Sequence, residues 1–302
     1  MGTIDFDTLL GGRVVGEGGG DGGPSQGAVS LTTHLRHLSA SSIGMLMRCP
    51  RQFQHRYLRG EKERPGENLV IGSSFHETLE WNYSQKIASH VDQPLADAVQ
   101  YLHDVAIPKV LEESGGVNEI NWDTDAGLES ARSDTERITS AYYRHVVPRI
   151  QPVETEQKFT IEVPGVEVPV IGYIDVQEAD RVLDTKTGKQ ASRKVKPSWQ
   201  LQGRTYSFAA QKPTEYHSVS RAKTPTIVTA LESADMIVPV PTEAQMMEFV
   251  RLVNTAADLI RYFLDTYGPD EEWPTWGAIP DFSRNILPCD FCGWRQGCPA
   301  WA

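Results

Sequence analysis

The sequence predicts an α/β or α+β domain built on a mixed central sheet with helices on its faces. Up to residue 150, and again near the C-terminus, apolar residues recur at helical spacing. Residues 151–240 are instead rich in Val, Ile, Phe and Thr, with Pro-Gly and Ala-Asp turns between the apolar runs. The composition, 39% hydrophobic and 23% charged over 302 residues, is that of an ordinary globular chain.

A single predicted domain occupies residues 38–302 and follows a flexible leader at residues 1–37, which is rich in glycine. Residues 38–150 are expected to be mainly helical, residues 151–240 to form the sheet core, and residues 241–302 to carry a last helix and a group of cysteines. No GxxxxGK[ST] motif occurs, so the sequence indicates no ATP-driven motor.

Four helical segments are expected before the sheet. Residues 38–58 form a helix that Pro50 interrupts near Cys49. Residues 71–87 form a second helix with Ser73 or Ser74 as its N-cap. The other two are residues 94–113 and 123–147.

The remaining elements follow in order. The segment 153–188 reads as three strands joined by short turns. A helix is expected next, at residues 198–211. Two strands follow at residues 215–222 and 226–231, and a long amphipathic helix at residues 242–267.

Two carboxylates and a lysine stand at neighbouring strand ends. Asp175 closes "VIGYID", and Asp184 and Lys186 flank Thr185 in "VLDTKTG". If these strands are antiparallel neighbours, the two aspartates come close, and Asp184 and Lys186 share one face while Thr185 points away. Such carboxylates bind Mg²⁺ or Mn²⁺, which offsets charge on a phosphate and activates water. The alternative is an exposed Asp-Lys pair on a solvated hairpin.

These motifs, taken together as "GYIDV…VLDTKTG…QGRTY", resemble the core of the RecB-like branch of the PD-(D/E)XK nuclease superfamily. The resemblance implies a restriction-endonuclease-like core and a Mg²⁺- or Mn²⁺-dependent DNA exonuclease. Its catalytic residues would be Asp175, Asp184, Lys186, Gln202 and Tyr206.

The same resemblance extends to "GSSFHETLE", where Gly72, His76 and Glu80 match a helical G-x-x-x-H-x-x-x-E motif. It implies that the metal ligands are His76, Asp175, Asp184 and the backbone carbonyl of Thr185. Taken alone, His76 is more typical of a structural histidine, and it is the surrounding pattern that favours a metal ligand. Gln202 and Tyr206 share a helix face, which in the family points at the DNA backbone; a surface Gln beside a core Tyr is the alternative.

Three of the four cysteines crowd the C-terminus in "CDFCGWRQGC", and the fourth is Cys49. Four thiolates can hold Zn²⁺ or a 4Fe–4S cluster, and paired C-x2-C knuckles, usual for zinc, are missing. The pattern is similar to that of iron–sulfur nucleases of the RecB-like branch, which include CRISPR-associated exonucleases and the AddB nuclease domain. The implied cluster ligands are Cys49, Cys289, Cys292 and Cys298, and the cluster would staple the C-terminal tail to the N-terminal helical segment.

Basic and aromatic residues indicate DNA, as single strands or ends, as the partner. A net charge of −11 argues against general nucleic-acid coating but does not exclude a basic cleft. Phosphates are expected to bind the basic side chains, and unpaired bases to stack on the aromatic rings. The candidates are Arg51, Arg56, Tyr57, Arg193, Lys194, Lys196 and Trp199; solvated charged faces are the alternative.

The cellular location of the protein is predicted from sequence features that are missing. No apolar run approaches the roughly 20 residues that span a bilayer, and no secretory signal begins the chain, so a cytoplasmic location is expected, that of the host if a phage encodes the protein. A recombinase or helicase partner and an oligomer are compatible with the sequence. Two other functions remain open: a catalytically idle DNA-end-binding module, and a zinc-stapled DNA-binding protein.

Overall fold

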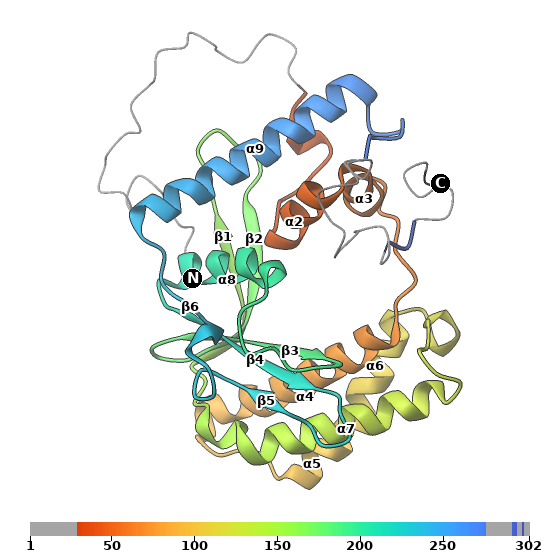
Figure 1. The fold of residues 1–302 in the computed structure, drawn as a ribbon, viewed down its shortest axis with the longest axis vertical. Coiled ribbons are helices and arrows are strands. Elements are labelled where there is room, and N and C mark those ends of the chain that lie inside the picture. Colours follow the sequence, from red (N-terminus) through yellow and green to blue (C-terminus); the bar gives the residue numbers. More distant parts are fainter. Residues whose placement is uncertain (1–28, 276–291, 295–297, 299–302) are drawn as a thin grey trace. The chain divides into compact units, whose positions relative to one another are not determined.

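The computed structural model describes residues 29–275, 292–294 and 298, and their elements are labelled in Figure 1. These residues divide into two compact units. Unit 1 contains the described residues up to 63, the segment 159–172 and the described residues from 241 onwards. Unit 2 contains residues 64–158 and 173–240. The prediction of a single domain over residues 38–302 stays a prediction.

The helices of unit 2 begin with α4, Glu67–Ser89, which is longer than predicted. Its N-cap is Gly66, so the assignment of Ser73 or Ser74 as the cap is wrong. Ser74 instead lies fully buried inside the helix, because tertiary packing extends the helix by four residues beyond its apolar pattern. The next helices are α5 (Leu95–Tyr101), the π-helical turn η3 (Leu102–Ala106), α6 (Ile107–Glu113) and α7 (Gly127–His145).

The sheet has the strand order β1-β2-β3-β4-β5, and β6 pairs with β4. Strand β2 is antiparallel to β3, as predicted, and β3 is parallel to β4. The sheet is therefore mixed, which confirms the α/β prediction. Its strands are β1 (Glu154–Ile161), β2 (Val170–Gln177), β3 (Val182–Gly188), β4 (Thr214–Ser220), β5 (Ile227–Val228) and β6 (Ile237–Val238), of which β6 was not predicted.

The two faces of β3 and β4 meet different helices. Leu183 and Val219 lie in one apolar cluster with residues of α4 and α7. On the other face, Tyr216 packs with Val238 and with Trp199 of α8 (Pro197–Ala210). Helices α4 and α7 lie on one side of β3 and β4, and α8 lies on the other (Figure 1). Because side chains alternate along a strand, odd-numbered residues of β3 and β4 face α4 and α7, and even-numbered residues face α8.

Unit 1 brings together segments that are far apart in the sequence. Helix α2 (Ala40–Arg48) starts at Ser39, whose side chain forms a capping box with Ser42. Helix α3 (Pro50–Phe53) and the π-helical turn η2 (Gln54–Leu58) follow the interruption at Pro50. The long helix α9, Glu243–Tyr267, confirms the predicted C-terminal helix. Among the described residues, no helix has both the length and the apolar character needed to cross a membrane.

Candidate functional site

The candidate site lies where β2 and β3 separate. The two strands pair at Val176 with Leu183 and at Gln177 with Val182. One position beyond this ladder they carry Asp175 and Asp184. The arrangement agrees with the prediction that the antiparallel pairing brings the two aspartates together.

The peptide of Thr185 is held by two of the predicted ligands. Its carbonyl oxygen lies 2.6 Å from Nε2 of His76, a residue of α4. Its backbone N–H donates to the carboxylate of Asp175. Nδ1 of His76 lies 3.2 Å from Oδ2 of Asp175, so one ring contacts both groups. Both partners of the imidazole are hydrogen-bond acceptors.

Burial and the neighbouring charges together set the pKa values of His76, Asp175 and Asp184. Burial alone would lower the pKa of His76, but the charge and hydrogen bond of Asp175 outweigh it and raise the pKa. Burial opposes ionisation of Asp175 as well, yet His76 and then Lys186 hold its pKa below the usual value. For Asp184, burial and the charge of Asp175 raise the pKa to about 6 despite the nearby Lys186.

Lys186 links Asp184 to helix α8. Its Nζ lies 2.9 Å and 3.0 Å from the two carboxylate oxygens of Asp184, whose side chain is fully buried. The same Nζ donates to Oε1 of Gln202 at 2.9 Å. Nε2 of Gln202 donates to the hydroxyl of Tyr206 at 2.7 Å. The predicted residues Asp184, Lys186, Gln202 and Tyr206 thus form one continuous contact chain on the α8 face of the sheet.

Glu156 is a residue of this region that the sequence did not reveal. It lies in β1 with a left-handed backbone, φ 47°. Glu156 is exposed, but partial desolvation of its carboxyl, followed by the charges of Asp175 and Glu80, raises its pKa to about 7. The pKa of Glu80, the last residue of the predicted helical motif, is also raised, by burial and by Glu77. No sequence motif includes Glu156. Its position near Asp175 depends on the backbone conformation of β1, which the sequence pattern does not reveal.

The side chains of His76, Asp175 and Asp184, with the carbonyl of Thr185, are of the chemical types that bind a hard divalent cation. An imidazole, two carboxylates and a carbonyl oxygen suit Mg²⁺ or Mn²⁺. As the side chains stand, however, no group of three or more His, Cys, Asp or Glu residues in the described segments could hold a metal ion. His76 instead contacts both Asp175 and the carbonyl of Thr185.

The predicted DNA-binding residues of unit 1 are partly used in packing. The guanidinium of Arg51 donates to the carbonyl of Trp273 at 2.8 Å and pairs with Glu272 at 2.6 Å. The ring of Tyr57 packs 5.2 Å from that of Phe53, and Arg56 is exposed. Arg51 therefore stabilises unit 1 in this structure, since its charge and donors are already engaged.

The predicted DNA-binding residues of unit 2 lie around the loop between β3 and α8. Arg193, Lys194 and Lys196 are exposed. Nζ of Lys196 lies 4.9 Å from the centre of the Trp199 ring, a cation–π contact. Arg193 donates to the carbonyl of Glu232 at 2.8 Å. This loop follows directly after the strand that carries Asp184 and Lys186.

The structure describes three of the four predicted cluster ligands. Cys49, Cys292 and Cys298 lie in unit 1, and Cys289 lies outside the described residues. No set of cysteines among those described forms a metal-holding group. The tail nevertheless contacts the N-terminal helical segment: the N–H of Gly293 donates to Glu63 at 3.3 Å, and the ring of Trp294 stacks on His55 at 5.2 Å.

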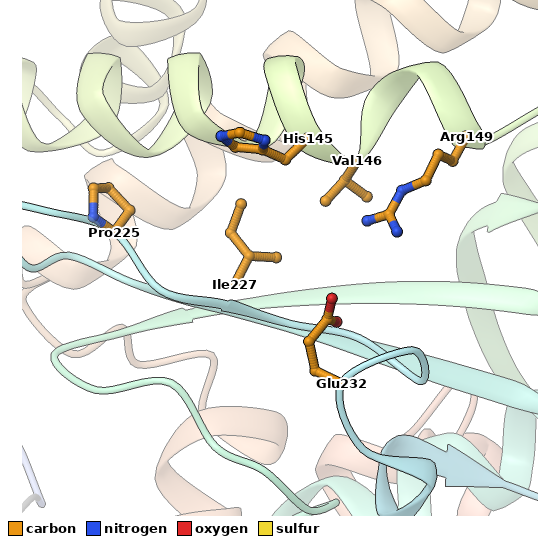
Figure 2. Close-up of a pocket in the computed structure, with 6 residues that line it drawn as sticks. All are labelled: His145, Val146, Arg149, Pro225, Ile227 and Glu232. Atoms are coloured by element: carbon orange, nitrogen blue, oxygen red, sulfur yellow. The ribbon is translucent and has the colours of Figure 1, made fainter.

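A cavity of about 400 Å³ in unit 2 contains none of the predicted site residues (Figure 2). Val146 and Arg149, which follow α7, lie on one side of it, and Ile227 of β5 lies on the other. The remaining lining residues are His145, Pro225 and Glu232. Nothing predicted from the sequence falls there.

Comparison with known proteins gives a family and a fold. Residues 37–299 match the family model PDDEXK_1, described as the PD-(D/E)XK nuclease superfamily. A crystal structure from Eubacterium rectale, named "Putative exonuclease", is similar at 13% identity and a TM-score of 0.51, over 81% of this chain and 86% of that one. A structure named SSO0001 aligns at 15% identity and a TM-score of 0.34, over 74% and 96%. No curated protein matches the sequence significantly.

Proposed function

The chain belongs to the PD-(D/E)XK nuclease superfamily, and on that premise we propose that it is a Mg²⁺- or Mn²⁺-dependent deoxyribonuclease that hydrolyses phosphodiester bonds at DNA ends. The observation that carries the proposal is the peptide of Thr185. His76 and Asp175 both bind it, and the residues on either side of it, Asp184 and Lys186, meet on the α8 face of the sheet.

The residues that would hold the cation are His76, Asp175, Asp184 and the carbonyl of Thr185. When bound, the ion supplies positive charge that offsets the charge of the scissile phosphate and lowers the pKa of water. His76 would bind such an ion through a neutral imidazole nitrogen, and the divalent charge would favour the ionised form of both Asp175 and Asp184.

Lys186 has the position of the group that acts on the attacking water. Asp184 and Gln202 hold its Nζ between β3 and α8, so the ammonium is oriented before substrate arrives. There it orients the water and stabilises the negative charge that develops on the phosphate. Tyr206 fixes Gln202 through its hydroxyl and so helps to hold Lys186 in place.

The preference for DNA ends, and a role in recombination, repair or DNA processing with a recombinase or helicase, rest on the resemblance to RecB-like nucleases. The exposed residues Arg193, Lys194 and Lys196 support a polyanionic substrate, because basic side chains beside the site attract backbone phosphates.

The test is digestion of end-labelled single- and double-stranded DNA with Mn²⁺, Mg²⁺ or EDTA. We expect cleavage with metal only, and a loss of about 100-fold or more in Lys186→Ala and in Asp184→Asn. Lys223→Ala, which removes an exposed lysine from the loop after β4, should retain full activity. Activity that survives in both site variants refutes the assignment, and binding of DNA ends without cleavage supports the idle module instead.

An iron–sulfur staple is a separate part of the proposal. The contacts of Gly293 with Glu63 and of Trp294 with His55 support a tail that docks on the N-terminal helical segment. Iron and sulfide analysis after anaerobic purification tests it: four iron atoms are expected for one cluster. Colourless protein with one zinc supports the zinc alternative, and protein without either metal contradicts both.

A further inference from the structure

We propose that Tyr142 is a positioning residue of the candidate site: it orients the Thr185 peptide from the opposite face of the sheet, and His217 in turn holds its hydroxyl. This inference rests on the proposed function and extends it to residues that no sequence motif includes. Tyr142 lies in α7 and is 1% exposed, so its hydroxyl reaches no substrate and acts only through its neighbours.

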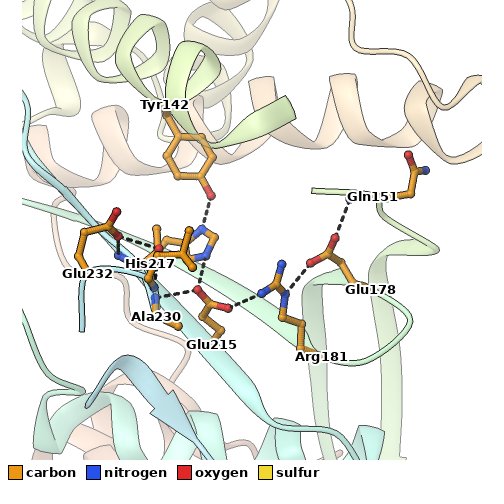
Figure 3. A network of polar contacts seen from close by, with 10 residues as sticks. Tyr142, Gln151, Glu178, Arg181, Glu215, His217, Ala230 and Glu232 are labelled. Carbon is orange, nitrogen blue, oxygen red and sulfur yellow. Dashed lines mark hydrogen bonds and ion pairs between the residues drawn. The ribbon is translucent and has the colours of Figure 1, made fainter. Parts of the chain in front are cut away.

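The register of the sheet places the partners together. Thr185 of β3 pairs with His217 of β4, and both side chains are on the face that meets α7. The hydroxyl of Tyr142 lies 2.5 Å from Nδ1 of His217 (Figure 3). It also lies 3.4 Å from Oγ1 of Thr185. The Tyr142 hydroxyl therefore bridges Thr185, which lies between Asp184 and Lys186 in β3, and His217, which pairs with Thr185 in β4.

The direction of these hydrogen bonds follows from Glu215. Oε1 of Glu215 lies 3.1 Å from Nε2 of His217 and accepts the N–H of Ala230 at 2.8 Å. Burial opposes ionisation of Glu215, but His217 and then Ala230 and Arg181 hold its pKa below the usual value. A carboxylate only accepts, so Nε2 carries the proton. When Nε2 carries the only proton of the ring, Nδ1 accepts from the Tyr142 hydroxyl, whose oxygen is then free to accept from Thr185.

The far end of the network anchors Glu215. Arg181 donates to Oε2 of Glu215 at 2.9 Å and to Glu178 at 2.6 Å, and Glu178 accepts the N–H of Gln151 at 2.6 Å (Figure 3). Glu215, His217 and Glu178 are at least nine-tenths buried. Because every member has a partner, the orientation of His217, and with it the position of the Tyr142 hydroxyl, is determined.

Tyr142 also contacts the helix that supplies His76. Its ring meets that of Phe75, the residue before His76, edge to face with centroids 5.4 Å apart. Thus the same side chain touches α4 beside the imidazole and β3 beside the carbonyl that the imidazole binds. A shift of this ring or hydroxyl changes the distance between His76 and Thr185, which are two of the proposed ligands.

Tyr143 supplies a matched comparison. It follows Tyr142 in α7, it is 5% exposed, and its hydroxyl is buried without a hydrogen-bond partner. Removing that hydroxyl takes away an equally buried oxygen of the same helix without touching the site. Any difference between Tyr142→Phe and Tyr143→Phe therefore reports on the bridge to His217 and Thr185 and not on the loss of a buried hydroxyl.

The experiment measures the Kd for Mn²⁺ by calorimetry in the full-length protein, without DNA, alongside thermal unfolding with EDTA. We expect Tyr142→Phe to weaken Mn²⁺ binding about 10-fold, the lower end of the range for residues that orient metal ligands. Tyr143→Phe should stay within about 2-fold of wild type. His217→Asn retains an acceptor for the Tyr142 hydroxyl, so it should bind Mn²⁺ more tightly than His217→Ala.

Equal Kd values for Tyr142→Phe and Tyr143→Phe overturn the inference, whatever their thermal midpoints, because the role of Tyr142 is then packing alone. Equal Kd values for the two His217 variants overturn the part assigned to the imidazole. If wild-type protein binds Mn²⁺ but cleaves no DNA, the proposed function is wrong. The Kd values of the variants still decide whether Tyr142 is a positioning residue. Failure of wild-type protein to bind Mn²⁺ contradicts both.

Discussion

At the scale of single residues, the partners of each acidic side chain decide whether it is charged. Asp175 faces His76 and the N–H of Thr185, which stabilise the carboxylate. For Glu156, partial desolvation and the charges of Asp175 and Glu80 outweigh the charge of His76 and raise the pKa to about 7. The two groups therefore affect stability in opposite directions as the pH changes.

The raised pKa of Glu156 predicts a loss of stability as the pH rises. The unfolded carboxyl gives up its proton near 4.5, whereas the folded one keeps it up to about 7, so ionisation opposes folding above that pH. In EDTA, Glu156→Gln should raise the thermal midpoint more at pH 8 than at pH 5. The exposed Glu162, changed to Gln as the control, should show no such difference; the same gain at both pH values for Glu156→Gln contradicts the prediction.

Glu215 predicts the reverse dependence. Its pKa is held below 4.5 in the folded protein, so its contribution is complete above that pH and is lost as the pH falls through the lowered pKa. Because Glu215→Gln leaves Arg181 and His217 without their charged partner, we expect a loss of about 3 kcal/mol at pH 7. Urea unfolding at pH 7 and pH 3 measures it, and a loss that does not shrink on acidification argues against the ion network.

At the scale of elements, helix α8 depends on a glycine for its approach to the sheet. A Cβ on Gly203 would lie 2.9 Å from both Cε2 of Tyr216 and Cγ2 of Val238. This close contact places Gln202, the next residue back, within reach of Lys186 on β3. Gly44 of α2 is also helical, but a Cβ there would meet nothing within 4 Å.

The two glycines form a matched pair of substitutions. Alanine favours a helix by about 1 kcal/mol over glycine, so Gly44→Ala should stabilise the protein. Gly203→Ala should destabilise it by about 1–2 kcal/mol, because the overlap with Tyr216 and Val238 outweighs the propensity gain. Thermal unfolding measures whether each substitution raises or lowers the stability. Stabilisation by Gly203→Ala would mean that α8 can move away from Tyr216 and Val238 to accommodate a methyl group.

At the scale of the whole molecule, the chain closes unit 1 through contacts between residues more than 200 positions apart. Trp273 is fully buried, its ring lies 6.1 Å from that of Phe53 and 5.0 Å from that of Phe263, and its N–H donates to Gln54. Gln54 also binds the carbonyls of Pro269 and Glu271. The segment after α9 is thus held against α3 and η2 by these contacts.

Trp273→Ala should therefore cost about 3–5 kcal/mol, as expected for a large buried aromatic. Tyr262→Ala, on the same unit but 58% exposed, should stay within about 0.5 kcal/mol. Urea unfolding followed by circular dichroism compares them. Equal midpoints for the two variants would show that the segment after α9 contributes nothing to unit 1.

Much of this protein could be predicted from the order of its residues. Alternating β-branched residues around Gly172 and Thr185 predicted strands, and the spacing of Asp184 and Lys186 predicted their common face, because side-chain direction follows from backbone period alone. The motif with His76 was assigned by resemblance, and helix α9 by its apolar repeat. These properties are local, so neighbouring residues were sufficient to reveal them.

Only the tertiary structure decided what each group touches. The engagement of Arg51 by Trp273, the raised pKa of Glu156 and the bridge from Tyr142 to His217 all join residues that are distant in the sequence. Charge and hydrogen-bond energies depend on distance and burial, which a linear pattern does not contain. The sequence therefore determined which chemical groups this protein has and which strands and helices carry them, and the packing of those elements decided which groups meet.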